Sequence, residues 1–267
     1  MHAVTILLSD IGNSRLKWSW LDNADNGIRT PQQTIAHGTQ AASEAALFHL
    51  HQLLQDHDPV QQLILVHVLG EAFTEAVHTL CQQQGCDLIV VNSQSTAYGI
   101  RLAYPNPAHF GADRFVGLLA TRQLAVDQAA IIVDSGTALT IDAIKRNGEH
   151  QGGLILPGLA LMCDALSQRT EARHMIEPLL EPITLFANNT RQAMGSGCLQ
   201  GLAQAVQGIC QRMQRELAEE TQVILCGGDA ERLYNLLEIN ARLRPDALMD
   251  GLHYVAKQEK IRSCTLS

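Results

Sequence analysis

The sequence predicts an α/β protein that consists of two closely packed lobes with mixed sheets. Short apolar runs alternate with longer amphipathic runs along the whole chain, which is typical of strands alternating with helices. Some neighbouring strands have no helix between them, so hairpins must occur beside parallel strands. A strand–turn–strand pattern near the N-terminus also returns in the second half of the chain, which indicates a duplicated fold.

Eight segments are rich in aliphatic or β-branched residues and are bounded by Gly, Asp or Asn, as strands are. In chain order they are Val4–Ser9, Arg15–Trp20, Leu63–Val68, Asp87–Val91, Ala130–Val133, Leu139–Ile144, Gly153–Leu156 and Gln222–Cys226. Six longer segments have the periodicity of helices. In chain order they are Ala41–Gln55, Glu71–Gln84, Ala112–Ala125, Leu159–Arg169, Asn189–Glu220 and Ala230–Leu237. In the fifth helix, apolar residues recur at three-to-four spacing and form one continuous face.

The repeated pattern is a strand followed by Asp, any residue, Gly and a small polar residue, and then a second strand. Its first copy contains Asp10 and Gly12, and its second copy contains Asp134 and Gly136. We therefore predict an N-terminal lobe over residues 1–120 and a C-terminal lobe over residues 121–267. No Pro/Gly/Ser-rich linker separates them, so we expect two lobes in close contact instead of freely tethered modules.

Composition narrows the class of protein. The chain has 267 residues, of which 46% are hydrophobic and 17% charged, so it has the length and apolar content for packed cores. The net charge of -8 argues against a nucleic-acid partner, and the apolar runs are too short to span a membrane. We see no secretion signal, and the seven cysteines lack the paired spacing of disulfide or zinc frameworks. We expect a cytoplasmic protein with reduced thiols.

Both predicted hairpins have residues suited to phosphate. The turn around Gly12 exposes backbone N–H groups that can hold phosphate oxygens, and Asp10 stands where a carboxylate can orient Mg²⁺ through water. Lys17 can add a positive charge. One such turn alone is more simply interpreted as an ordinary β-turn, but its recurrence at Gly136 and Thr137 favours two phosphate-binding hairpins.

A second group of polar residues precedes a predicted helix. Gly111 stands at the helix start, where backbone N–H groups favour anions, and Asp113 and Arg114 occupy the first turn. Helix capping alone explains the acidic residue. A cation at this position is electrostatically unfavourable, however, which suggests that Arg114 serves an anionic ligand. The residues by themselves leave both interpretations open.

Four motifs in order resemble the signature of the type III pantothenate kinases, including the Bvg accessory factor branch. They are Asp10-x-Gly12-Asn13-Ser14, Gly111-x-Asp113-Arg114, Asp134-x-Gly136-Thr137-Ala138-x-Thr140-x-Asp142, and Gly152-Gly153 through Pro157-Gly158. With Gly227-Gly228, the resemblance extends over almost the whole chain. It implies the duplicated actin-like, ribonuclease H-like ATPase fold of the acetate and sugar kinase, Hsp70 and actin superfamily.

The resemblance also implies an activity: ATP-dependent phosphorylation of pantothenate to 4′-phosphopantothenate, the first step of coenzyme A biosynthesis. The implied cofactors are ATP with Mg²⁺ and a monovalent cation, K⁺ or NH₄⁺, and the implied assembly is a homodimer with its substrate pocket near the subunit interface. Asp113 corresponds to the catalytic base, Asp134 to the monovalent-cation residue and Asp10 to an indirect Mg²⁺ ligand. ATP would be bound by Asp10, Ile11, Gly12, Asn13, Ser14, Arg15, Leu16, Lys17 and Thr137. Pantothenate would be bound by Tyr98, Gly111, Ala112, Asp113, Arg114 and Thr190.

Small departures from the family pattern leave this chemistry intact. Ser14 stands where many members have Thr, and Cys226 precedes Gly227 where Thr is common. Two other functions fit part of the sequence: another small-molecule kinase of the same superfamily, or an accessory protein for a transcriptional regulator. An acceptor panel would separate the first from a pantothenate kinase. The intact constellation of Asp10, Asp113, Asp134 and Thr137 argues against a purely binding role.

Overall fold

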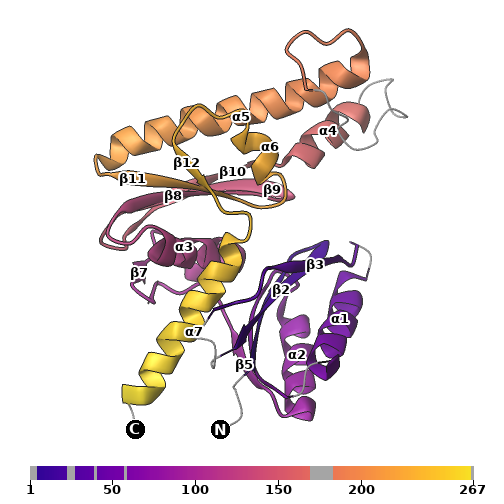
Figure 1. Cartoon of the computed structure of the whole chain (residues 1–267), viewed down its shortest axis with the longest axis vertical. Helices are drawn as coiled ribbons and strands as arrows, with labels where there is room; N and C mark the ends of the chain where they lie inside the picture. Colours follow the sequence, from indigo (N-terminus) through magenta and orange to yellow (C-terminus); the bar gives the residue numbers. More distant parts are fainter. Residues whose placement is uncertain (1–4, 23–27, 39–40, 57–58, 169–182, 266–267) are drawn as a thin grey trace. The chain divides into compact units, whose positions relative to one another are not determined.

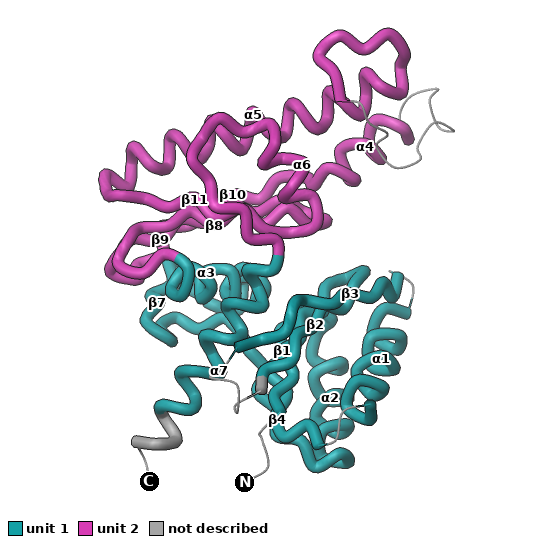
Figure 2. Tube along the Cα trace, in the orientation of Figure 1, with its two compact units in different colours: residues 1–124, 246–267 teal, residues 125–245 magenta. Residues whose placement is uncertain are grey.

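The computed structural model describes residues 5–22, 28–38, 41–56, 59–168 and 183–265 (Figure 1). The chain divides into two compact units (Figure 2). Unit 1 comprises residues 1–124 and 246–267, and unit 2 comprises residues 125–245. The chain thus leaves unit 1 after α3 and returns to it for its last helix, whereas the predicted ranges of 1–120 and 121–267 assign that last segment to the second lobe.

Unit 1 contains a five-stranded sheet in the order β3-β2-β1-β4-β5. Its strands are β1 (Thr5–Ile11), β2 (Arg15–Asp22), β3 (Gln33–Ala36), β4 (Val60–His67) and β5 (Asp87–Val90). The first three pair antiparallel, and β4 and β5 run parallel to β1. The helices are α1 (Ala42–Asp56), α2 (Glu71–Gln84), α3 (Ala112–Leu124) and α7 (Ala247–Thr265). The small hairpin β6 (Thr96–Ala97) and β7 (Ile100–Arg101) and the 3-10 helix η1 (Pro107–His109) lie before α3.

The two faces of this sheet carry different helices. Leu7 and Ile11 of β1 pack in one core with α1 and α2, while α3 and α7 contact the sheet through β1 and β4 (Figure 1). Because side chains alternate along a strand, Asp10 points away from the α1–α2 core. The one carboxylate of β1 therefore lies on the face of the sheet that α3 and α7 contact.

Sequence reasoning missed α7, and its burial explains why. Residues spread around the helix are buried, including Leu248, Met249, Leu252 and Asp250, so no polar stripe marks a 3.6-residue period. Gly251 lies directly against the backbone of α3, where any side chain would overlap it. This close approach of α3 and α7 is the physical reason that the last helix belongs to unit 1.

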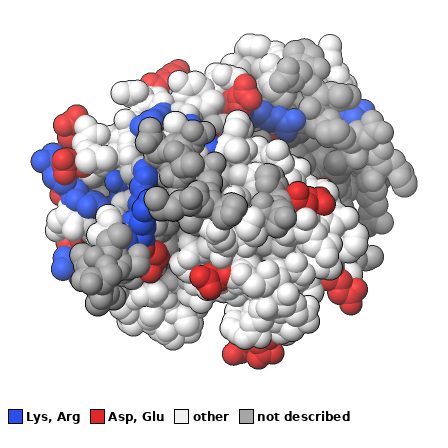
Figure 3. Space-filling view, turned by 60° about the horizontal axis from the view of Figure 1, so that its bottom comes forward, with Lys and Arg blue, Asp and Glu red and all other residues white. Residues whose placement is uncertain are grey.

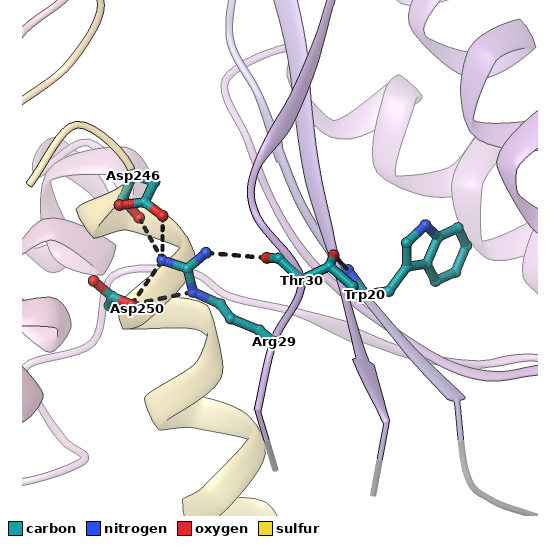
Figure 4. A network of polar contacts seen from close by, with 5 residues as sticks. All are labelled: Trp20, Arg29, Thr30, Asp246 and Asp250. Atoms are coloured by element: carbon teal, nitrogen blue, oxygen red, sulfur yellow. Dashed lines mark hydrogen bonds and ion pairs between the residues drawn. The ribbon is translucent and has the colours of Figure 1, made fainter. Parts of the chain in front are cut away.

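A buried ion-pair network fixes the start of α7 (Figure 4). The Arg29 guanidinium contacts Asp246 Oδ2 at 2.5 Å and Asp250 Oδ1 at 2.8 Å, and its Nε also donates to Asp250 Oδ1 at 3.1 Å. The side chains of Arg29 and Asp250 are only 7% and 2% exposed. Thr30 follows Arg29 and accepts a hydrogen bond from the Trp20 N–H through its hydroxyl oxygen, which ties the network to β2.

Unit 2 repeats the sheet of unit 1, with the order β10-β9-β8-β11-β12. Its strands are β8 (Ala129–Ser135), β9 (Ala138–Ile144), β10 (His150–Pro157), β11 (Thr221–Cys226) and β12 (Ala241–Leu243). Its helices are α4 (Leu159–Gln168), α5 (Thr190–Leu217) and α6 (Ala230–Tyr234). The predicted apolar face of α5 is confirmed, since Leu202 and Val206 are buried in the core with Ile131 and Val133 of β8.

The predicted duplication is confirmed by pairing as well as by strand order. Asp10 lies opposite Lys17 in the first hairpin, and Asp134 lies opposite Thr140 in the second. The eight predicted strands and six predicted helices all correspond to observed elements with slightly different ends. Val4 and Arg169, at the ends of two predicted elements, fall outside the described residues. The structure adds β3, β6, β7, η1, β12 and α7, which are mostly very short.

No helix in the described parts of the chain is both long and apolar enough to cross a membrane. On the face drawn in Figure 3, acidic side chains stand mostly singly, and Lys and Arg gather toward one side. The six cysteines whose side chains are described are free thiols. Cys264 falls outside this set.

Candidate active site

The first predicted phosphate turn lies between β1 and β2. The Gly12 N–H donates to the Arg15 carbonyl at 3.0 Å, and the Ser14 carbonyl accepts from the His37 N–H at 3.0 Å. Asn13 and Arg15 are exposed at this turn, whereas Ile11 and Leu16 are fully buried in the α1–α2 core. The last two side chains therefore cannot reach a ligand, and any contact from these positions must come from their backbone.

The carboxylate of this hairpin is paired across the two strands. Asp10 Oδ2 lies 3.2 Å from Lys17 Nζ, and the Asp10 side chain is 7% exposed. The ion pair keeps a carboxylate and an ammonium group beside the turn. A bound phosphate would need the positive charge, and a bound metal ion would need the negative charge. In the part of the chain that the structure describes, no group of three or more His, Cys, Asp or Glu could hold a metal ion alone. The single carboxylate of Asp10 beside the turn fits Mg²⁺, which usually takes only one or two carboxylates and completes its shell with water and phosphate.

His67 supports the same turn from the neighbouring strand and was not predicted. It lies opposite Ile11 in the parallel β1–β4 pair, and the following Val68 N–H donates to the Ile11 carbonyl. Its Nδ1 accepts from the Leu69 N–H at 3.2 Å, so its Nε2 carries the proton and donates to Thr74 Oγ1 at 2.9 Å. Burial lowers the pKa of His67, which keeps the imidazole neutral.

Asp113 stands in the first turn of α3. Its Oδ1 accepts the Arg114 N–H at 2.8 Å, while the Phe115 N–H donates to the Gly111 carbonyl and closes the first helical turn. Burial raises the pKa of the Asp113 carboxyl, and the negative charge of Asp10 raises it further. The two carboxylates from distant parts of the sequence are thus within electrostatic reach of each other. A carboxylate with a raised pKa is a better proton acceptor than an ordinary one.

Gly111 and Ser93 determine where Asp113 can lie. A Cβ at Gly111 would stand 2.5 Å from Asp113 Oδ1, so the carboxylate occupies the space that the missing side chain leaves. The Ser93 hydroxyl donates to the carbonyls of Phe110 at 2.8 Å and Gly111 at 3.3 Å, which fixes the approach to the helix. Sequence reasoning missed Ser93, because nothing in the local pattern links two positions that are 18 residues apart.

Arg114 is held by aromatic rings. It is 8% exposed, and its Cζ lies 4.4 Å from the centroid of the Phe110 ring and 5.8 Å from that of Tyr104. Its Nη1 also donates to the Tyr104 hydroxyl at 3.4 Å. These cation–π contacts stabilise a cation at the unfavourable end of a helix. The sequence argument for an anionic ligand therefore overlooked a second explanation for the position of Arg114.

Tyr98 occupies a strained turn between β6 and β7. Tyr98 and Gly99 have φ values of 52° and 76°, the left-handed values that a two-residue hairpin turn requires at both positions. Left-handed backbone is uncommon for a bulky residue and costs about 1–3 kcal/mol, so such residues cluster at functional sites. Tyr98, Asp113 and Arg114 all belong to unit 1.

The second predicted phosphate turn belongs to unit 2. The Gly136 N–H donates to the Ala138 carbonyl at 3.1 Å, and Thr137 is exposed at the tip. The Gly158 N–H donates to the Thr137 carbonyl at 3.1 Å. Gly227, with φ 93°, lies against Asp134 Oδ1 and the Ser135 carbonyl. The later glycine turns of the chain therefore pack on the hairpin and shape it, a role that the sequence alone did not assign them.

Thr190, the remaining predicted substrate contact, is the first residue of α5 and is exposed. The preceding Asn189 caps the helix by accepting the Gln192 N–H at 2.9 Å. Thr190 and Thr137 lie in unit 2, apart in the chain from the unit 1 residues Asp10, Tyr98 and Asp113.

Gly111→Ala tests whether the position of the Asp113 carboxylate affects turnover separately from the stability of α3. The added methyl group meets the end of a flexible side chain, so the fold should tolerate it while the carboxylate moves. We expect kcat to fall about a hundredfold, the typical cost of a displacement near 1 Å at a reacting group. Steady-state kinetics and thermal unfolding measure the two effects. Gly201→Ala, at an exposed site with no neighbours, is the control, and a stable variant with unchanged kcat would contradict the prediction.

Gly158→Ala tests the packing around the second hairpin. The methyl group would overlap the backbone carbonyls of Gly136 and Thr137, which cannot move without reshaping the turn. We expect a loss of about 3 kcal/mol in the free energy of unfolding and weaker ATP binding. The control is Gly208→Ala, in the exposed interior of α5, which should gain up to about 1 kcal/mol. Equal stability of the two variants in denaturant titrations would show that the overlap does not constrain the hairpin.

Comparison with known proteins shows the family of this chain. The family described as type III pantothenate kinase matches residues 6–212. The type III pantothenate kinase of Nitrosococcus oceani is 34% identical over 265 residues, which cover 96% of each chain. That of Azoarcus sp. is 31% identical and covers 97% of this chain and 93% of its own.

Solved structures show the fold. A Baf family transcriptional activator from Campylobacter jejuni superposes with a TM-score of 0.60 at 21% identity, covering 95% of this chain and 98% of its own. The activator of 2-hydroxyisocaproyl-CoA dehydratase from Clostridium difficile, solved with bound ADPNP, superposes with a TM-score of 0.56 at 12% identity. It covers 100% of this chain and 98% of its own. The fold is thus the predicted duplicated actin-like one, and the chain belongs to the type III pantothenate kinase family.

Proposed function

We propose specific residue roles for the ATP-dependent phosphorylation of pantothenate, the activity to which the family of this chain points. The observation that carries the assignment is Asp113, a half-buried carboxylate with a raised pKa that stands near Asp10 at the start of α3. Phosphoryl transfer requires mainly that the reactants be positioned and that charge be stabilised. One residue must also receive the proton of the attacking hydroxyl.

Asp113 is the proposed base. Its carboxylate accepts the proton of the terminal pantothenate hydroxyl as that oxygen bonds to the γ-phosphorus of ATP and the bond to the β-phosphate oxygen breaks, releasing ADP. The Arg114 N–H holds one carboxylate oxygen, which leaves the other available for the hydroxyl. The neighbouring Asp10 disfavours a second negative charge, so it increases the tendency of Asp113 to take up a proton.

The two hairpins are the proposed phosphate contacts. The turn from Gly12 to Lys17 and the residue Thr137 would bind ATP oxygens. Lys17 would contribute a positive charge to the same phosphates, and Asp10 would orient bound Mg²⁺ through water. When bound, Mg²⁺ neutralises charge that develops on the transferred group.

Asp134 is the proposed site of monovalent-cation dependence. Its Oδ1 and the Ser135 carbonyl both lie against Gly227, which brings two oxygen donors close together. K⁺ prefers oxygen ligands, and NH₄⁺ can donate hydrogen bonds to the same oxygen atoms. We expect Asp134→Asn to lose stimulation by KCl, measured against tetramethylammonium chloride at equal ionic strength. Stimulation equal to that of the parent protein would remove Asp134 from this role.

Pantothenate is the proposed ligand of Tyr98, the segment from Gly111 to Arg114, and Thr190. The aromatic support of Arg114 orients its guanidinium, whose planar donors match a carboxylate. The homodimer and the cytoplasmic location that the family resemblance implies are part of the same proposal. Light scattering of the purified protein tests the dimer, which should have twice the mass of the 29.1 kDa chain.

An acceptor panel tests the proposed activity. The purified protein is incubated with ATP, MgCl₂ and KCl, and ADP release is followed with pantothenate, acetate, glucose or no acceptor. We expect release that requires pantothenate and is at least a hundredfold slower with the other acceptors. Faster release with acetate or glucose would assign the chain to another kinase reaction. Bound ATP without release in any mixture would favour a binding role.

A further inference from the structure

The C-terminal helix holds one of the proposed pantothenate contacts by two separate hydrogen bonds. The Tyr98 hydroxyl donates to Glu259 Oε1 at 3.0 Å, and the Tyr98 carbonyl accepts from the Tyr254 hydroxyl at 3.3 Å. Tyr254 and Glu259 are five residues apart on α7 and more than 150 residues from Tyr98 in sequence. The helix therefore fixes both the backbone and the ring of this residue.

Such support has a physical reason. Tyr98 has a left-handed φ of 52°, which a free chain adopts rarely for a bulky side chain. The β6–β7 hairpin has only two residues in each strand, too few to impose that conformation by itself. Strained conformations persist where the surrounding structure holds them from several sides. Here α7 supplies a charged acceptor for the ring hydroxyl and a donor for the carbonyl.

The start of α7, the helix that supports Tyr98, is itself anchored. α7 starts at the ion-pair network of Arg29 with Asp246 and Asp250, and Gly251 brings it against α3, the helix that carries Asp113. Helix α7 thus contacts both α3, which carries the proposed base, and Tyr98, the proposed substrate contact. We propose that Glu259 and Tyr254 are positioning residues that hold Tyr98 in the orientation that binds pantothenate. This inference rests on the proposed function and deepens it.

Kinetic constants for each substrate test the inference. A hydrogen bond to a charged group is lost in Glu259→Ala, so we expect KM for pantothenate to rise about tenfold. We expect kcat and KM for ATP to stay within about twofold, because the site of phosphoryl transfer is unchanged. Glu259→Gln keeps an oxygen acceptor and should restore most of the affinity. Lys257→Ala, at an exposed position on the same helix, is the matched control.

A double-mutant cycle separates positioning from general damage. Tyr98→Phe removes the donor of the same hydrogen bond, so the double variant should bind pantothenate no more weakly than the weaker single variant. Additive effects, or a rise in KM for ATP of equal size, would overturn the inference. Unchanged KM for pantothenate in Glu259→Ala would overturn it as well.

Hydrogen exchange provides a readout that needs no turnover. Amides of residues 96–101 should exchange faster in Glu259→Ala and Tyr98→Phe than in the parent protein, and Lys257→Ala should leave them unchanged. Unchanged exchange in both test variants would overturn the anchoring. Faster exchange in a protein that phosphorylates no pantothenate in any variant would retain the anchoring and overturn the proposed function alone.

Discussion

Asp113→Asn is expected to lower kcat by about 10²–10⁴-fold, the usual contribution of a general base. Asparagine has nearly the same shape and can still accept the Arg114 N–H through its amide oxygen, so the helix start should remain intact. It cannot accept the proton of the pantothenate hydroxyl. The Kd for ATP should stay within about twofold, because the proposed phosphate contacts lie on the two hairpins. Rapid-quench kinetics and calorimetric titration with ATP measure the two quantities.

The pH dependence follows from the raised pKa of Asp113. The base works only when deprotonated, so kcat/KM of the parent protein should fall as the pH drops through a value above the ordinary aspartate pKa. Stability changes in the opposite sense. As the pH rises through this pKa, the folded state must hold a partly desolvated charge, and the stabilisation from the protonated form is lost. Asp113→Asn should therefore unfold at a higher temperature than the parent at pH 8, with a smaller difference at pH 4.

Asp87→Asn is the matched control, because it removes an equal charge from an exposed site in unit 1. It should alter neither kcat nor the pH profile. Turnover by Asp113→Asn within about threefold of the parent would remove Asp113 from the role of base. If kcat/KM of the parent protein did not fall at acidic pH, this would contradict the link between the pKa of Asp113 and the rate.

Arg29→Met is expected to cost about 3–5 kcal/mol in the free energy of unfolding. The variant leaves Asp246 and Asp250 without this cation in a buried region, and the start of α7 loses its attachment near β2 (Figure 4). Methionine fills similar volume, so the loss reflects charge more than packing. Urea titrations followed by circular dichroism measure it.

Arg232→Met provides the comparison for this ion pair. Its partner is Asp229, at 3.1 Å, but the Arg232 side chain is 46% exposed. Exposed pairs contribute about 0–1 kcal/mol, so this variant should be nearly as stable as the parent. Equal losses in the two variants would show that burial of the Arg29 network does not determine its contribution.

The duplicated architecture could be predicted because it leaves local signals. Each copy places an Asp at the end of an apolar strand and a Gly in the turn that follows, and the two sheets then pair in the same order. The register adds what local signals cannot provide. It places Lys17 opposite Asp10 but Thr140 opposite Asp134, so the two copies present different chemistry at equivalent positions.

The parts that sequence did not predict depend on contacts between distant segments. Because α7 is buried on several sides, its sequence shows no alternation of polar and apolar residues with a helical period. Its attachment to Arg29 joins positions that are more than 200 residues apart. The local sequence around Arg114 shows only its unfavourable place at a helix start, whereas its contacts with the rings of Tyr104 and Phe110 arise from the three-dimensional fold. The support of Tyr98 by Glu259 is of the same kind.

The identity of the phosphorylated product tests the central claim most directly. Phosphorus NMR of the protein with ATP, MgCl₂, KCl and pantothenate should show a phosphomonoester signal, coupled to CH₂ protons, that grows in step with ADP. Mass spectrometry should identify it as 4′-phosphopantothenate. ADP accompanied only by inorganic phosphate, with pantothenate recovered unchanged, would contradict the account.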